Sequence, residues 1–127
     1  MEYTPEKITR LEPGQIFVFG SNLDGRHGKG AALTAMRKFG AKYGVAEGLT
    51  GQCYALPTVG KRLSRMPLRD VEAHCLKFVK FARTRPDLTF LVTPVGCGLA
   101  GFSPRQIAHF FIDAPDNCIL PKCFCEP

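Results

Sequence analysis

Two glycine-rich segments carry residue types that suit phosphate binding. The first is GSNLDGRHGKG at residues 20–30, and the second is GCGLAG at residues 96–101. Glycine lets an anion approach the backbone closely, and the N-terminus of a following helix offers unpaired N–H groups and about half a positive charge. Two such helix ends facing one cleft can bind the two phosphates of a pyrophosphate. Glycines that only make tight turns are the alternative.

Three polar side chains of the first loop are candidates for further chemistry. Asn22 carries both a donor and an acceptor, which suits a ribose hydroxyl or a water, but it can also close its own turn. Asp24 is the only carboxylate of the loop, so it is the candidate general base, with a turn-forming role as the alternative. His27 can act as an acid or base, donate to phosphate, or be an exposed loop side chain.

The cysteines are weaker candidates. Cys97 lies between two glycines, where it could be a nucleophile activated by a helix N-terminus or simply a small residue in a tight loop. Cys123 and Cys125 are too close and too few for a zinc site without His109 and Cys118, so we predict no metal and no cofactor. The cysteines lie mostly in apolar segments, which favours buried free thiols over disulfides.

Strands must lead into these loops, and apolar runs predict them. The runs at 16–19, 52–59 and 88–96 are typical of buried strands. Pro57 is expected to close the second, because a central strand excludes proline from its interior. Residues 117–121 are expected to add a short strand.

Helices are expected after the loops. Apolar spacing predicts one over 30–39, one from Pro67 to about residue 85, and one over 104–112 that begins at Ser103 as its N-cap. The last residues, 122–127, are expected to be a tail.

The unit of strand, glycine loop and helix occurs twice, which predicts an α/β fold. Helices on both faces of a mostly parallel central sheet make a three-layer α/β/α arrangement. The length of 127 residues predicts one domain over 1–127, with its core at about 16–120. Ligands of such sheets bind at the carboxyl ends of the strands, so both glycine loops are expected on that edge.

Composition limits the partners. A net charge of +6 favours anionic partners, and the basic segment 61–85 is either a solvated helix face or a nucleic-acid groove. No apolar run is long enough to cross a bilayer, and MEYTPEKITR lacks the apolar core of a signal peptide. We therefore expect a cytoplasmic protein with no membrane partner.

Four motifs together resemble the macro domain, the ADP-ribose-binding module. They are GSN at 20–22, HGKGAA at 27–32, TGQCYALPT at 50–58 and GCGLAGF at 96–102. The chain is also similar to short bacterial and phage proteins that share FGSNLxGxHGxGAA and GCGLAG. The resemblance implies a macro-domain-like fold and, as partner, a small-molecule nucleotide such as ADP-ribose or an ADP-ribosylated substrate. Nucleic-acid binding through residues 61–85 is the alternative.

Residue by residue, the resemblance implies that Asn22 lies on the ribose side, that both loops contact the ligand, and that Phe102 stacks beside the distal ribose. The implied ligand-binding residues are Gly20, Ser21, Asn22, Gly28, Gly30, Ala31, Gly96, Cys97, Gly98, Leu99, Ala100, Gly101 and Phe102. Hydrolytic macro domains often carry an aspartate at about the place of Ala32, so binding is better supported than hydrolysis. If hydrolysis occurs, Asn22, Asp24 and His27 are the candidate catalytic residues.

Overall fold

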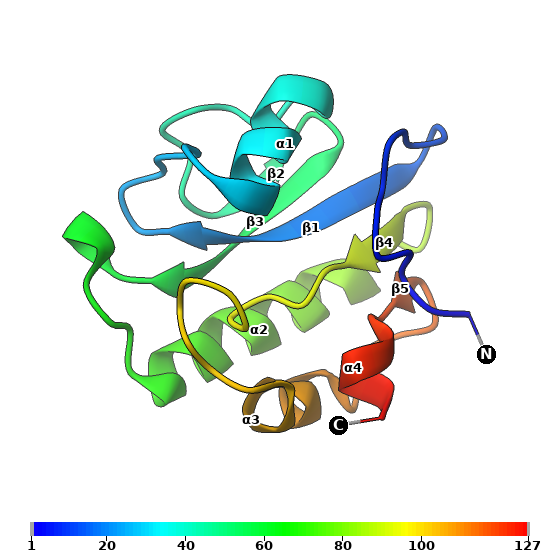
Figure 1. Ribbon diagram of the computed structural model, residues 1–127. Helices are drawn as coiled ribbons and strands as arrows, with labels where there is room; N and C mark the ends of the chain where they lie inside the picture. The colour runs from blue at the N-terminus through cyan, green and yellow to red at the C-terminus, as the bar shows by residue number, and fades with distance from the viewer. Residues whose placement is uncertain (1, 127) are drawn as a thin grey trace.

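A five-stranded sheet forms the centre of the computed structural model, which describes residues 2–126 (Figure 1). Its strands are β1 (Gln15–Asn22), β2 (Gly48–Thr50), β3 (Cys53–Val59), β4 (Thr89–Val92) and β5 (Cys118–Ile119). Their order in the sheet is β2-β3-β1-β4-β5. Only β2 is antiparallel to its neighbour, so the expected α/β class and mostly parallel sheet are confirmed.

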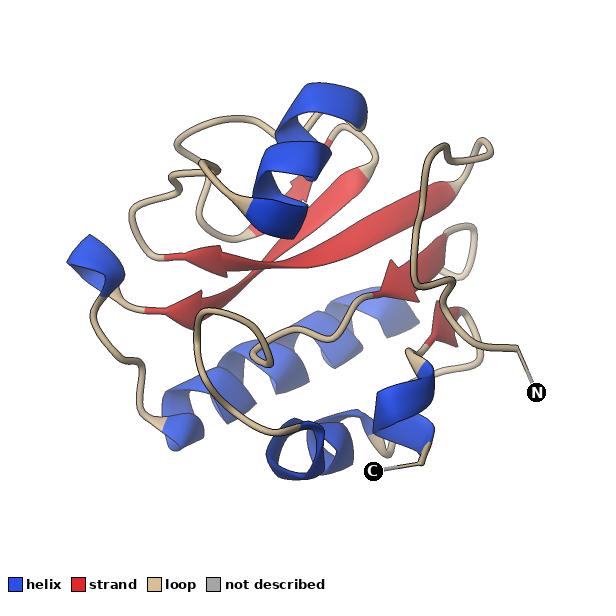
Figure 2. Ribbon diagram, viewed as in Figure 1, coloured by secondary structure: helices blue, strands red, loops and turns tan. Residues whose placement is uncertain are grey.

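Helices pack against the sheet from two sides. They are α1 (Gly30–Lys38), α2 (Leu68–Arg83), α3 (Pro104–Ala108) and α4 (Lys122–Cys125), with short 3-10 turns η1 (Lys61–Leu63) and η2 (His109–Phe111). Figure 2 shows α1 on one side of the strands and α2, α3 and α4 on the other. The three main predicted helices are present, although the third ends as the 3-10 turn η2.

β1 is buried on both faces, which explains its continuous apolar run. Successive side chains of a strand point to opposite faces. Ile16 and Val18 accordingly pack with α2, whereas Phe17 and Phe19 pack with α1. β1 therefore lies between two hydrophobic cores, one on each face of the sheet, and so does its carboxyl end.

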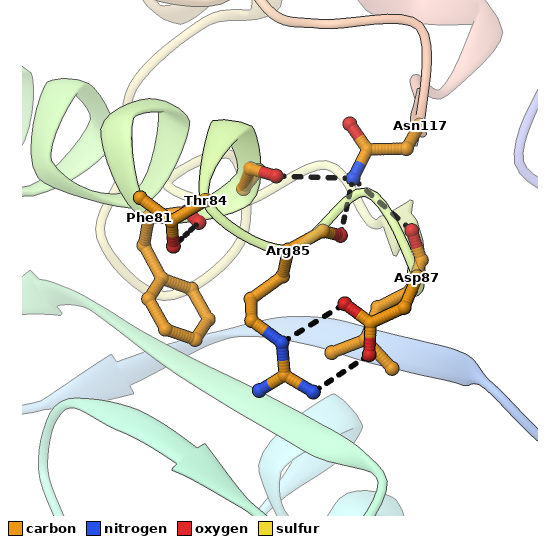
Figure 3. Close-up of polar contacts among 7 residues, drawn as sticks. Phe81, Thr84, Arg85, Asp87 and Asn117 are labelled. Carbon is orange, nitrogen blue, oxygen red and sulfur yellow. Dashed lines mark hydrogen bonds and ion pairs between the residues drawn. The ribbon is translucent and has the colours of Figure 1, made fainter.

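The end of α2 is tied to the strand that follows it by the side chain of Asn117 (Figure 3). Its Nδ2 donates to the carbonyl oxygens of Ala82, Arg85 and Leu88 at 3.1, 2.9 and 3.1 Å. Because these carbonyls close α2 and the turn into β4, one side chain next to β5 sets how the helix and two strands meet.

Several strand boundaries differ from the prediction. β4 covers only Thr89–Val92 of the predicted 88–96, because Pro94 has no N–H to donate to the sheet and the backbone turns there, with the Cys97 N–H bonded to the Pro94 carbonyl at 3.2 Å. β5 covers only Cys118–Ile119 of the predicted 117–121. Pro57 lies inside β3, opposite Ser21 of β1, rather than at its end. β2 pairs with β3 only over Cys53–Ala55, so β3 has a neighbour on one side alone at Pro57, where proline is tolerated. β1 also continues past residue 19 to Asn22, with an irregular register at its last pair.

Two elements differ from the sequence prediction altogether. The segment between the first predicted helix and the second predicted strand, for which no element is expected, contains β2, and the predicted tail contains α4. Phe124 of α4 is buried and stacks on Phe111, with ring centroids 5.5 Å apart. α4 thus contributes Phe124 to the core on the α2 side of the sheet.

Candidate functional site

A cavity of about 500 Å³ lies at the carboxyl ends of β1, β3 and β4. β1 stands between the other two strands, so the segments that follow all three converge at this edge of the sheet. The first glycine loop leads from β1 to α1, and the second leads from β4 towards α3. Both loops line the same cavity, as expected for ligand sites of parallel sheets.

Most of the residues expected at the site line this cavity. They are Gly20, Ser21, Asn22, Asp24, Gly28, Gly30, Ala31, Gly96, Gly98, Leu99 and Ala100. Four others do not line it: His27, Cys97, Gly101 and Phe102.

The cavity has an excess of positive charge. Arg26, Lys29 and Arg62 line it, whereas Asp24 is the only carboxylate among its described lining residues. The backbone N–H of Arg62 donates to Oδ2 of Asp24 at 2.6 Å, so part of that negative charge is already bonded. Sequence reasoning did not select these three cations, although each stands close to a glycine loop or directly after a strand.

The N-terminus of α1 faces this cavity with its backbone donors unoccupied by caps. Its N-cap, Lys29, makes no side-chain capping bond, and no acidic residue stands in the first turn. Gly30, Ala31 and Ala32 line the cavity at this helix end. Their N–H groups have no side-chain cap and are available to an anion.

The N-terminus of α3 differs from expectation. Ser103 is its N-cap, as predicted, but it forms a reciprocal pair of bonds with Gln106: Oγ accepts from the Gln106 N–H at 3.3 Å, and the Ser103 N–H donates to Oε1 at 2.9 Å. This capping box occupies donors that we expected to bind phosphate. The second loop can contribute its own N–H groups near Gly98, but not those of a free helix end.

Asn22 closes its own loop. Its Nδ2 donates to the carbonyl of Arg26 at 2.9 Å, and its Oδ1 accepts from the Arg26 N–H at 3.0 Å. An amide has two N–H groups and two acceptor lone pairs, so one of each remains for the cavity. Asn22 therefore shapes the first loop and can still contact a ligand.

His27 lies in the core rather than in the cavity. Its side chain is 1% exposed, and its ring meets Phe19 edge-on at a centroid distance of 5.2 Å. Nε2 lies 3.1 Å from the carbonyl of Lys42, which assigns the ring proton to Nε2, while Nδ1 is buried without a partner. His27 fastens the first loop to the turn after α1, and it is not placed to act as a base in the cavity.

Cys97 and Phe102 also face the protein interior. Burial raises the pKa of the Cys97 thiol to about 11, so at neutral pH it stays protonated and is a poor nucleophile. Phe102 is 5% exposed, and the guanidinium carbon of Arg65 lies 5.3 Å from its ring centroid. Its ring is covered by the core and by Arg65, which leaves no face for the expected ribose stacking.

Searches of the chain against protein-family models, curated proteins and solved structures found no match. The likeness to the macro domain therefore rests on the sequence motifs.

Several cations of the basic segment 61–85 have intramolecular partners. Lys77 and His74 contact Glu47 at 3.0 and 2.6 Å. Arg83 donates to the carbonyl of Asp113, and Arg85 pairs with Asp87 at 2.8 Å (Figure 3). Part of this positive charge thus serves to join elements of the fold.

Within residues 2–126, no group of three or more His, Cys, Asp or Glu side chains could hold a metal ion. Over the same residues, no helix has the length and apolar character needed to cross a membrane. The six cysteines are free.

Proposed function

We propose that this cavity binds a phosphate-bearing nucleotide of the ADP-ribose kind, in a three-layer α/β/α protein of macro-domain type. The observation that carries the proposal is one cavity lined by both glycine loops and by three cationic side chains. Its volume of about 500 Å³ falls in the range of small-molecule sites. The motif resemblance selects ADP-ribose among nucleotides.

Both loops contribute hydrogen bonds to the phosphates in this proposal. Phosphate oxygens accept hydrogen bonds from the N–H groups at the start of α1 and from the backbone near Gly98, while Arg26, Lys29 and Arg62 neutralise the charge. The lining is otherwise largely apolar, through side chains such as Val59. That surface suits the ribose carbons and the base.

Glycine substitutions at 28 and 98 test this arrangement. A Cβ at Gly28 or Gly98 would meet no atom within 4 Å, and neither residue has a left-handed φ. Gly98→Val should therefore keep the fold and place two methyl groups where phosphate approaches. Loss of two charge-assisted bonds predicts a Kd for ADP-ribose raised by about 100-fold or more in calorimetry.

Two variants control this experiment. Gly98→Ala should weaken binding less than Gly98→Val, and Leu76→Val on the exposed side of α2 should leave it unchanged. Thermal unfolding must show all three variants folded. The proposal fails if the wild type binds neither ADP-ribose nor its relatives at millimolar concentration, and the loop assignment fails if folded Gly98→Val binds normally.

Hydrolysis of ADP-ribosyl bonds is a further part of this proposal, and it depends on Asp24. The attacking water needs a base, and Asp24 is the only carboxylate among the described cavity residues. Its Oδ2 bonds to Arg62, whereas Oδ1 has no hydrogen-bond partner within residues 2–126. Asp24→Asn keeps an acceptor for Arg62 but removes the base, so kcat should fall by about 10²-fold or more with binding retained. Absence of turnover in the wild type would make the protein a binder only.

Nucleic-acid binding through residues 61–85 has less support, because Lys77, Arg83 and Arg85 are engaged within the chain. Binding to nucleic acid with a steep dependence on salt would favour it.

A further inference from the structure

Two exposed leucines stand at the cavity. Leu63 is 60% exposed and Leu99 is 75% exposed, and both line it. Leu63 follows β3 and Leu99 follows β4, with β1 between these strands, so they belong to two different walls. A single exposed leucine is ordinary on a protein surface, but two that line one cavity are both available to a ligand bound there.

The backbone at Leu63 adds a second, independent observation. Arg62 has φ 56° and Leu63 has φ 58°, and they are the only non-glycine residues with positive φ within residues 2–126. Glycine occupies the nine other positive-φ positions of that range. Left-handed backbone is unfavourable for residues with a Cβ, and such outliers gather at ligand sites. Positions 62 and 63 thus carry side chains where glycine would relieve strain.

Within residues 2–126, the hydrogen bonds that hold this turn do not involve the Leu63 side chain. The turn is closed by backbone bonds, from the Gly60 N–H to the Ser64 carbonyl at 2.8 Å and from the Ser64 N–H to the Lys61 carbonyl at 3.0 Å. Asp24 adds its bond to the Arg62 N–H. These contacts hold the backbone in place but leave the Leu63 side chain largely in water.

We propose that Leu63 and Leu99 bind the heteroaromatic base of the nucleotide. This inference rests on the proposed function and assigns a subsite within the same cavity. Aliphatic side chains can cover the face of a planar ring but cannot hydrogen-bond to its edge. The subsite therefore requires a base and discriminates weakly between bases, since an apolar pocket does not strongly reject ligands of similar shape.

The test compares ADP-ribose with ribose 5-diphosphate, which lacks the adenosine and with it the base, on matched variants. Leu63→Met keeps an apolar side chain, whereas Leu63→Asn is polar and accepts left-handed backbone more readily. Leu99→Met and Leu99→Asn repeat the comparison on the other wall. Calorimetry gives the Kd values, and thermal unfolding shows whether each variant is folded.

Each asparagine variant should raise the Kd for ADP-ribose by about 10-fold, because the base then buries less apolar surface, and change that for ribose 5-diphosphate by less than about 2-fold. The methionine variants should bind ADP-ribose like the wild type. Leu63→Asn should melt at or above the wild-type temperature, because it relieves the strained turn. ADP-ribose and its guanine analogue should bind within about 5-fold of each other.

Equal losses for both ligands, or unchanged ADP-ribose binding in folded Leu63→Asn, would overturn the base subsite and leave the proposed function standing. A wild type that binds neither ligand would remove both.

Discussion

Replacing His27 separates a structural role from a catalytic one. In His27→Ala, a truncated core side chain costs about 2–5 kcal/mol, and the lost bond to Lys42 adds about 1 kcal/mol. Removing the unpartnered Nδ1 regains about 1–3 kcal/mol, so with the middle of each range the net loss in the free energy of unfolding is about 2–3 kcal/mol. With about 2.1 cal/mol/K of unfolding entropy per residue, 127 residues give about 0.27 kcal/mol/K, and Tm should fall by about 7–11 °C.

His27→Phe is the matched variant. A phenyl ring refills the space beside Phe19, and the lost bond to Lys42 is offset by the lost Nδ1. The free energy of unfolding should stay within about 1 kcal/mol of the wild type, and ADP-ribose binding should persist. Calorimetric melting and titration measure both. A His27→Ala variant that melts within about 2 °C of the wild type would refute the buried placement. A folded His27→Phe that binds but loses all turnover would make His27 catalytic after all.

Three further predictions concern residues that join elements of the fold away from the cavity. Asn117→Ala should lower the free energy of unfolding by about 1–3 kcal/mol in denaturant titration, and isosteric Asn117→Asp should lower it more, because a carboxylate repels the three carbonyls that the amide binds. Phe124→Ala should lower the free energy of unfolding by about 3–5 kcal/mol, whereas the same substitution in an unpacked C-terminal tail would leave it unchanged. Partial burial raises the pKa of Glu47, but bonds and charge from its two basic partners outweigh this and lower it below its ordinary value. The ionised Glu47 therefore contributes to the free energy of unfolding above its unfolded pKa, and this contribution is lost as pH falls through its folded pKa. Glu47→Gln should accordingly make the free energy of unfolding depend less on pH below about pH 4.5.

The main strands and helices were predictable because each carries a strong pattern. The apolar run at Ile16 to Phe19 marks a strand buried on both faces, and the stripe from Val71 to Ala82 marks the inner face of α2. Ser103 followed by Pro104 marks the start of α3. In these elements the local preference and the tertiary packing agree.

The remaining elements depend on long-range contacts. β2 is three residues long and pairs with β3 alone, which is too short for any periodicity. Pro57 is tolerated inside β3 only because β2 ends before it, a fact about a neighbour rather than about Pro57. Phe124 is buried because Phe111 lies beneath it, 13 positions earlier in the chain.

The site likewise combines features that follow from sequence pattern and topology with features that depend on tertiary packing. Glycine spacing was enough to place both loops at one edge of the sheet, since topology brings parallel strand ends together. The side chains of His27 and Phe102 turn into the core instead, and a loop sequence gives no sign of which polar or aromatic side chain will be buried.

Arg62 and Leu63 mark the limit of sequence reasoning at this site. A positive φ is predicted from glycine, and nine glycines of the described chain adopt it, but these two residues do so without that signal. Asp24, from the loop after β1, accepts the Arg62 N–H and so adds a bond from another loop to the turn after β3. A local rule is broken where two loops meet over a cavity, and such exceptions concentrate at functional sites. The same bond therefore connects the candidate base, the strained turn and the proposed base subsite, so Asp24→Ala should weaken ADP-ribose binding through Leu63 while Asp24→Asn should not.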